Sequence, residues 1–232
     1  AITISKGSDP TQTTNSKITY GNNITFIDNF DLSKFTIFGG SKNAPVDSTS
    51  ITMNDGMVAY IYGGGYGTSE STKADVTGTA NISIAGGKLS TIYGGGLLYS
   101  TVANSNISMT GGTTTFIMGG GACSVKGMPS PGTIDNPYTT ISGTASINVS
   151  GGTAIYVMGG GQGYSQVNNA EITISGNANI TELIAGGSNG STKPTASINI
   201  NGGTIEMVFS VNRGSLENPT IIVTDGNINN LY

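Results

Sequence analysis

The chain has 232 residues, of which only 9% are charged, and its formal net charge is −4. With 13 acidic against 9 basic residues it offers no basic patch to neutralise phosphates, which argues against nucleic-acid binding and against anionic membrane surfaces. The single cysteine, Cys123, excludes an internal disulfide, and no stretch reaches the roughly 18 apolar residues typical of a membrane span, so we expect no membrane insertion.

The first repeated element is a triplet of an apolar, a polar and an apolar residue. In chain order its copies are residues 51–53, 82–84, 107–109, 147–149, 172–174 and 198–200. Alternation with a period of two predicts half-buried strands whose outer pair points inward and whose central Thr, Ser or Asn faces solvent. Most copies end at a Gly-Gly pair such as Gly86-Gly87, where a residue free to take positive φ allows the chain to turn.

The second repeated element follows each triplet and consists of an aliphatic residue, then usually an aromatic residue or Met, then glycines. The clearest copies are residues 61–65, 92–96, 117–121 and 157–161, and weaker ones are 37–40, 184–187, 208–209 and 231–232. In six units the aromatic or Met position lies eleven residues after the start of the triplet. The units that begin at Ile24 and Ile172 are stretched, with Phe38 and Ala185 as their expected equivalents. A fixed offset of this kind is the signature of a solenoid.

From Ile51 onward the triplets recur after 23 to 26 residues in four of six cases, and the two longer gaps follow Gly65 and Gly121. Glycine is too dense for helices to propagate. We therefore predict an all-β chain, folded as a single-stranded right-handed parallel β-helix (solenoid) of roughly eight to nine coils. We expect one domain over residues 1–232, which begins with Ala1 rather than Met and is a fragment of a longer surface protein.

The direction of the second strand's side chains stays open at this stage. If the aromatic position points inward, as the alternation of Ile205, Met207 and Phe209 suggests, the preceding aliphatic residues form an outward stripe. That stripe would comprise Ile37, Ile61, Ile92, Ile117, Val157, Ile184, Val208 and Leu231, and it could dock another domain or chain. Alternatively the strand bends at the corner and both neighbours are buried.

The string of Gly-Gly-Thr, a short variable stretch, an aliphatic residue, an aromatic residue or Met and three glycines occurs at residues 111–121 and 151–161. It resembles repeats of large surface proteins of gut and other Gram-positive bacteria, which are similar in pattern to right-handed parallel β-helices of the pectate-lyase-like class. The resemblance covers roughly residues 24 to 232. It implies a secreted or wall-associated location and an adhesive or carbohydrate-facing role, and no catalytic residue of the lyase class can be carried over.

An enzyme on this fold is the second hypothesis. Polysaccharide lyases and hydrolases need paired carboxylates, or an acidic metal site with a basic residue that abstracts a proton. The chain has no His, and Glu70, Asp75 and Asp135 lie in the two insertions, where they could converge. Solvated loop charges are the more ordinary interpretation of these acids. We expect no catalytic residue, no metal site and no cofactor.

Binding has a stronger basis in the sequence. Tyr66, Tyr99 and Tyr164 follow triple glycines, and Tyr138 lies in the longest insertion, so all four are expected along one edge of the rod. A tyrosine ring offers an apolar face and a hydroxyl to a sugar or a peptide, although rings that merely cover the glycine corners would look the same. The insertion at residues 121–146, which contains three prolines, is a candidate recognition loop.

These features predict an extracellular, non-catalytic adhesin or stalk module that is secreted or associated with the cell wall. Its expected partners are a glycan or a host or cell-surface protein, together with adjacent domains of the same chain. A passive spacer is the third hypothesis. An ice-binding face is disfavoured because the polar ladder mixes Ser, Asn and Thr.

Overall fold

In a computed structural model of the chain, the structure describes residues 1–12, 14–21, 24–123, 138–188, 195–211, 216 and 218–232. Within these ranges the chain is all-β and contains no helix, so none is present that could span a membrane. Sixteen strands form one mostly parallel sheet, and two short strands form a second one. The prediction of an all-β chain is confirmed, and the long parallel sheet is compatible with a β-solenoid.

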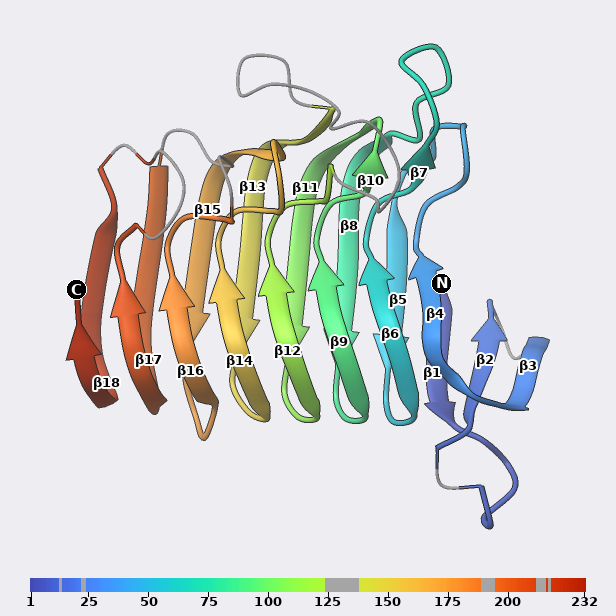
Figure 1. Cartoon of the computed structure of the whole chain (residues 1–232), viewed down its shortest axis with the longest axis horizontal. Helices are drawn as coiled ribbons and strands as arrows, with labels where there is room; N and C mark the ends of the chain where they lie inside the picture. The colour runs from blue at the N-terminus through green and yellow to red at the C-terminus, as the bar shows by residue number, and fades with distance from the viewer. Residues whose placement is uncertain (13, 22–23, 124–137, 189–194, 212–215, 217) are drawn as a thin grey trace.

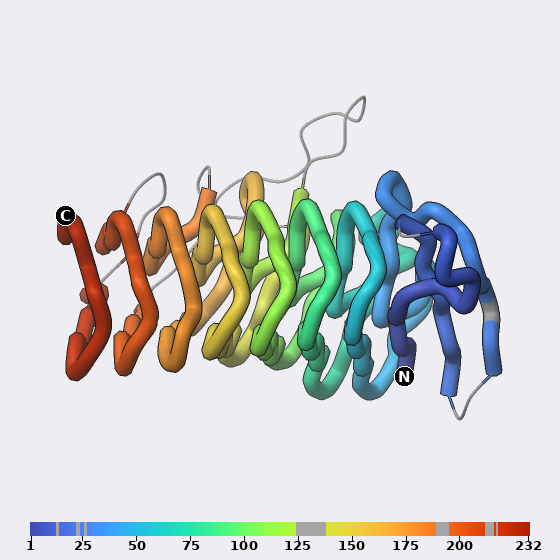
Figure 2. Tube along the Cα trace, turned by 90° about the horizontal axis from the view of Figure 1, so that it is seen from below, coloured from blue at the N-terminus to red at the C-terminus, as the bar shows by residue number. Residues whose placement is uncertain are grey.

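The large sheet is folded into two facing rows, which Figure 1 shows one behind the other. The triplet row contains β1 (Ile2–Lys6), β5 (Thr49–Met53), β8 (Val76–Ile84), β11 (Ser100–Met109), β13 (Thr139–Val149) and β15 (Gln166–Ile174). The aromatic row contains β4 (Leu32–Phe38), β6 (Met57–Tyr62), β9 (Lys88–Tyr93), β12 (Thr113–Met118), β14 (Thr153–Met158) and β16 (Asn179–Ile184). The long strands β17 (Thr195–Phe209) and β18 (Thr220–Leu231) contribute to both rows. The trace winds from one row to the other and back as it advances (Figure 2).

The triplets pair in register along the whole triplet row. Ile51 is opposite Ile82, Ile82 opposite Ile107, and Ile107 opposite Ile147, and the ladder continues through Ile172 to Ile198. All six of these isoleucines are at most 1% exposed, whereas the polar residue that follows each of them faces outward. The predicted alternation is confirmed, and the isoleucines pack against their counterparts in the neighbouring strands.

The aliphatic residues of the aromatic row face this same core. Ile61, Ile92, Ile117, Val157 and Val208 are completely buried in it. Of the two alternatives, the outward aliphatic stripe with an inward aromatic position is therefore wrong. The alternative, in which both neighbours are buried, is correct at Ile61 and Tyr62. Ile61 faces the interior core, and Tyr62 is buried in a second hydrophobic cluster on the outer face of this row.

The two kinds of glycine have different physical roles. The second glycine of each Gly-Gly pair, such as Gly112, has positive φ and makes the short turn between the rows. The triple glycines instead allow close stacking: a Cβ on Gly63 would lie 2.5 Å from the carbonyl oxygen of Gly94 and 3.0 Å from the Cβ of Ala80. There is no room for a Cβ between the backbones at this corner, so the glycine recurs from Gly39 to Gly159, and Ala185 and Ser210 replace it in the last two strands.

The N-terminal segment departs from the repeat. β1 pairs with β5 in parallel, but β2 (Ser16–Tyr20) and β3 (Ile24–Phe30) extend the sheet in antiparallel fashion. The triplet that pairs with Ile51 is thus the one that starts at Ile2, and the assignment of Ile24 was wrong. A smaller error lies near the other end, where Ile184 rather than Ala185 is the partner of Met158 and Leu183 is the inward aliphatic residue.

Candidate functional site

The outer face of the aromatic row carries a continuous line of large side chains, which we call the outer ladder. Its members are Phe38, Tyr62, Tyr93, Met118, Met158, Ile184 and Phe209, each in register with the next, and Tyr232, which stacks on Phe209. Each follows an inward aliphatic residue directly, so the pleat places it on the opposite face of the strand. These residues form a hydrophobic cluster separate from the interior core.

A second line of residues runs beside the outer ladder, just beyond the glycines, and we call it the corner ladder. It consists of Lys42, Tyr66, Leu97, Ala122, Gln162 and Ser188, which form successive parallel pairs. Tyr66 and Leu97 belong to the two short strands β7 (Tyr66–Gly67) and β10 (Leu97–Leu98). Because the chain bends at the glycines, the corner ladder and the outer ladder form the two sides of a trough.

In the N-terminal half, aromatic side chains fill this trough. The rings of Phe38, Tyr62 and Tyr93 stack in succession, with centroid separations of 5.0 and 4.5 Å. Tyr66 from the corner ladder stacks on Phe38 at 5.9 Å, and the Lys42 ammonium lies 5.8 Å from the Tyr66 ring centroid. The hydroxyl of Tyr93 donates a 2.5 Å hydrogen bond to Oε1 of Gln162. These contacts leave little room for a ligand.

Burial changes the acidity of the filled part. The pKa of Tyr62 is raised far above its usual value by burial, with smaller effects of Tyr93 and Tyr60. The pKa of Tyr93 is raised to about 12, mainly by burial and in smaller part by the nearby Tyr60, while a hydrogen bond with Tyr62 opposes the shift. Both phenols are therefore neutral hydrogen-bonding groups at physiological pH and serve to fix the ladder rather than to transfer protons.

Further along the rod the same trough is open. A groove of about 400 Å³ lies there, lined by Phe116, Tyr156, Met158, Glu182, Ile184, Gly187 and Ser188. The outer ladder holds Met158 and Ile184 at these strands instead of tyrosine, and the corner ladder carries Ser188 at the position of Tyr66 and Leu97. The groove thus exists because smaller side chains occupy positions that rings fill elsewhere.

The four predicted tyrosines do not form one site. Tyr99 and Tyr138 come together as a stacked pair, with ring centroids 4.3 Å apart and an interplanar angle of 23°. Tyr66 instead packs into the trough against Phe38. Tyr164 is 39% exposed and makes no ring contact with the described residues. That these tyrosines bind a ligand stays a prediction.

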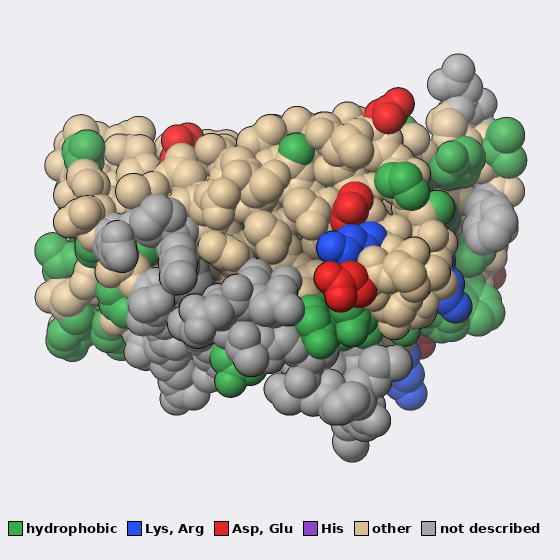
Figure 3. All heavy atoms as spheres, turned by 90° about the horizontal axis from the view of Figure 1, so that it is seen from above, with side chains coloured by type: hydrophobic (Ala, Val, Ile, Leu, Met, Phe, Trp, Pro, Cys, Tyr) green, Lys and Arg blue, Asp and Glu red, His purple; other side chains and the backbone are tan. Residues whose placement is uncertain are grey.

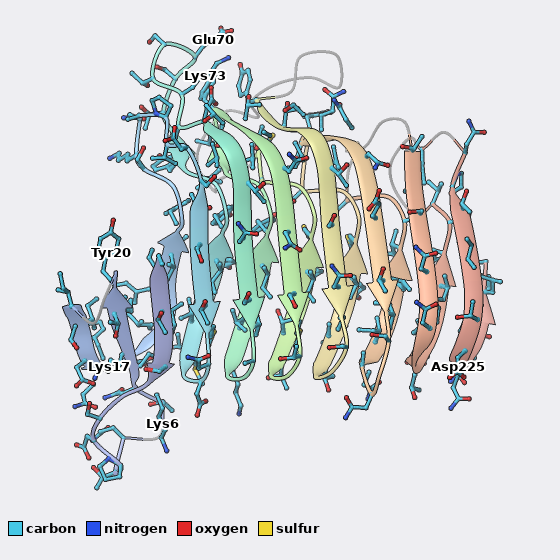
Figure 4. All side chains as sticks on the ribbon, turned by 180° about the vertical axis from the view of Figure 1, so that it is seen from behind. Lys6, Lys17, Tyr20, Glu70, Lys73 and Asp225 are labelled. Carbon is cyan, nitrogen blue, oxygen red and sulfur yellow. The ribbon has the colours of Figure 1, made fainter. Side chains whose placement is uncertain are left out.

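The Tyr99–Tyr138 pair is held at both backbones. The carbonyl of Tyr99 accepts a 3.0 Å hydrogen bond from the N–H of Ala74, and the carbonyl of Tyr138 accepts one of 3.1 Å from the N–H of Ser100. The pKa of Tyr99 is raised, first by its hydrogen bond with Tyr138 and in smaller part by the charge of Glu70. Glu70 lies with Lys73 on the loop that stands above the N-terminal strands (Figure 4).

The acids considered for catalysis are only partly described. The carboxylate of Asp75 accepts a 2.7 Å hydrogen bond from the backbone N–H of Thr101, which fixes the loop. Asp135 and most of the predicted recognition loop lie outside the described residues. In the described ranges, no group of three or more His, Cys, Asp or Glu side chains could hold a metal ion. Cys123 is buried, and burial raises its pKa to about 11, so its thiol is protonated at neutral pH.

Sequence reasoning missed the groove, although one signal for it was present. Phe116 and Tyr156 lie two residues before the Met of their repeat, on the same face of the strand, and they stack at 4.8 Å with an interplanar angle of 10°. A second aromatic position in the repeat could thus have been noticed. Gly187 belongs to the glycine run of the repeat, but the small corner residue Ser188, which also lines the groove, is marked by no local pattern.

Comparison with protein-family models, with curated proteins and with solved structures gave no match to this chain.

Proposed function

We propose that this chain is a right-handed parallel β-helix of roughly eight to nine coils that acts as an extracellular, non-catalytic adhesin or stalk module. It binds a glycan or protein partner through the loops at its corner edge. The handedness follows from the strong general preference of parallel crossover connections. The observation that carries the binding role is the stacked Tyr99–Tyr138 pair, whose members lie in separate loops of the chain.

The pair has the properties of a preorganised contact. Both backbones are hydrogen-bonded to neighbouring turns, so little conformational entropy is lost when a ligand binds. Stacked tyrosines present a rigid apolar surface with hydroxyl groups, a combination suited to a sugar ring or to a peptide. The charge of Glu70 makes a small contribution to the raised pKa of Tyr99.

A location outside the cell is supported by the surface. Uncharged side chains make up most of the described surface on the face shown in Figure 3, and most of the few charged ones lie towards the N-terminal half, with an acidic side chain towards the C-terminal end. The outward ladder of Thr, Ser and Asn on the triplet row is likewise uncharged. Such a surface is suited to a rigid module that projects from a cell wall and presents its edge.

Glycan-array binding by the wild type and by Tyr99→Ala and Tyr138→Ala variants tests the proposal. Each substitution is expected to weaken binding at least about fivefold, since an aromatic contact contributes roughly 1 to 3 kcal/mol. Tyr60→Ala is the matched control, because Tyr60 is 40% exposed on the aromatic row and lies outside the corner loops.

Two results would contradict the proposal in different ways. If the wild type and both variants are equally silent on the array and towards cell-surface proteins, the chain is a passive spacer. If the protein releases unsaturated or reducing sugars from pectin-like polymers, and Glu70→Gln abolishes this release, it is a polysaccharide-degrading enzyme.

A further inference from the structure

The N-terminal end of the rod is stepped. The triplet row continues beyond β1 through β2 and β3, whereas β4 is the last described strand of the aromatic row. β1 pairs with β5, and β4 pairs with β6, which follows β5 after a short turn, so β1 and β4 lie at the same level of the rod. The antiparallel pair β2–β3 therefore projects two strands beyond β4, as Figures 1 and 4 show.

The step leaves an apolar cleft, which we call the N-terminal cleft. It has a volume of about 430 Å³, and the apolar part of its lining comprises Ile2, Ile18, Tyr20, Ile24, Ile37 and Phe38. Its wall is accessible, since Tyr20 is 59% and Ile24 66% exposed. On its other side lies the outer edge of β4, which no described strand pairs. An unpaired sheet edge beside an apolar wall favours a partner that supplies strands.

A second copy of the chain has the shape that fills this cleft. A two-fold axis parallel to the strands, placed at the end of the rod, exchanges the two rows and reverses the direction of the rod. The two projecting strands of each copy then occupy the two missing positions in the aromatic row of the other. β3 runs in the direction of the triplet row and β4 in the opposite direction, so β3 of one copy lies antiparallel beside β4 of the other. Each copy gives and receives the same surface, as in an isologous dimer.

The surfaces that meet in this arrangement are apolar. The inner face of β2, with Ile18 and Tyr20, faces the inner face of β3 of the other copy, with Ile24 and Ile27, and symmetry repeats the contact. Ile18 belongs to the interior core and Ile27 packs against it, so the dimer continues one core through both copies.

The paired edges are also complementary in charge and adequate in size. Asp28 is the charged residue of β3 and Lys34 that of β4, and both are exposed. Tyr20, Phe30 and Phe35 are 59%, 48% and 45% exposed, which at roughly 200 Å² for an aromatic side chain amounts to about 300 Å² per copy. Pairing of the seven-residue strands β3 and β4 adds to this area, towards the roughly 800 Å² per partner that stable interfaces bury.

The opposite end of the rod fits the step poorly. β18 contributes to both rows, so the two rows end there at one level. If this end docked on the N-terminal end of another copy, its triplet half would meet β3 while its aromatic half stayed two strands away from β4. The N-terminal cleft would then remain open.

We propose that two copies of this chain join end to end at their N-terminal ends, with β3 of each copy paired to β4 of the other. This dimer goes beyond the proposed function, and its interface shares no residue with the Tyr99–Tyr138 pair. The dimer presents that pair twice along one longer rod, which increases the avidity for a multivalent partner if the pair binds one.

Sedimentation equilibrium of the full chain provides a direct test. At about 50 µM the expected mass is twice the 23.4 kDa of one chain. Small-angle X-ray scattering is expected to give a maximum dimension about twice that of a single rod, because the copies join end to end.

Two pairs of variants locate the contact. Ile24→Lys brings an unpaired charge into the cleft from a side chain that is 66% exposed in the single copy, so the chain folds and dimerisation weakens at least about a hundredfold. Val223→Lys is its matched control, because Val223 is 47% exposed on β18 at the other end. Lys34→Glu places like charges on the paired edges and weakens dimerisation about tenfold, whereas Lys88→Glu, on exposed Lys88 of β9, leaves it unchanged.

A mass of one chain at up to about 100 µM would overturn the proposal. So would equal effects of Ile24→Lys and Val223→Lys, equal effects of Lys34→Glu and Lys88→Glu, or undiminished dimerisation of an Ile24→Lys variant that circular dichroism shows to be folded. Masses that grow beyond two chains with concentration would also overturn it, because the proposed contact closes after two copies. None of these results bears on the glycan-array experiment, which depends on Tyr99 and Tyr138.

Discussion

Replacement of Ile107 by Ala tests the stacked core most sharply. Ile107 is fully buried and lies between Ile82 and Ile147 in the neighbouring strands, where backbone hydrogen bonds on both sides hold its neighbours in place. A cavity at this site can collapse little, because closing it would require two strands to leave their register. Large-to-small changes in cores cost 2 to 5 kcal/mol, and the rigid surroundings place this one in the upper half of that range, at about 4 kcal/mol.

The measurement is denaturant unfolding followed by circular dichroism, with Ser108→Ala as the control one residue along the same strand. Ser108 faces outward in the polar ladder, so its replacement is expected to change the free energy of unfolding by less than about 0.5 kcal/mol. Similar losses for the two variants, or a loss below about 1 kcal/mol for Ile107→Ala, would refute the alternation of buried and outward residues.

Three further predictions follow from the glycine corner, the outer ladder and the buried thiol. Gly63→Ala is expected to lower the free energy of unfolding by about 1 to 3 kcal/mol, because its Cβ would lie 2.5 Å from the carbonyl oxygen of Gly94; an unchanged denaturation midpoint would contradict this. The pKa of Tyr93 is raised from 10.0 to about 12 in the folded chain, so the unfolded chain loses this proton first as the pH rises. The free energy of unfolding is therefore unaffected by this group below pH 10 and falls as the pH rises from 10 to 12. The loss amounts to about 2 to 3 kcal/mol, and a Tyr93→Phe variant should show a shallower alkaline decline in denaturation midpoint than the wild type. Cys123, with a pKa raised from 9.0 to about 11, should react with a thiol reagent at pH 7 about a hundredfold more slowly than in unfolded protein, and equal rates would contradict its burial.

The parts of the fold that depend on local periodicity could be predicted from the sequence. The triplet at residues 107–109 shows its alternation directly, and the recurrence of Ile at the same offset shows which residues pair. The direction of the side chains stayed open where a strand is apolar on both faces. Around Tyr62 both Ile61 and Tyr62 are apolar, so composition alone could not show which of them faces the core.

The N-terminal assignment failed for a related reason. Ile24 begins an apolar stretch at a plausible distance from Phe38, but β3 pairs antiparallel with β2, and the partner of Ile51 is Ile2. Antiparallel and parallel pairing of such short apolar segments give the same local pattern.

The candidate site was harder to predict than the fold. The Tyr99–Tyr138 stack and the groove at Glu182 each join residues from different turns, and these contacts depend on which loops are neighbours in the structure.

The most direct test of the account is a set of distances between spin labels along the polar ladder. In a Cys123→Ala background, one label is placed at Ser83 and the second at Asn148, Thr173 or Asn199, which lie two, three and four strands away. With about 4.8 Å between strands, the separations should rise in equal steps, at about 10, 14 and 19 Å. Separations that do not increase in this order, or that scatter without a common step, would contradict the in-register stack on which the core, the trough and both proposals depend.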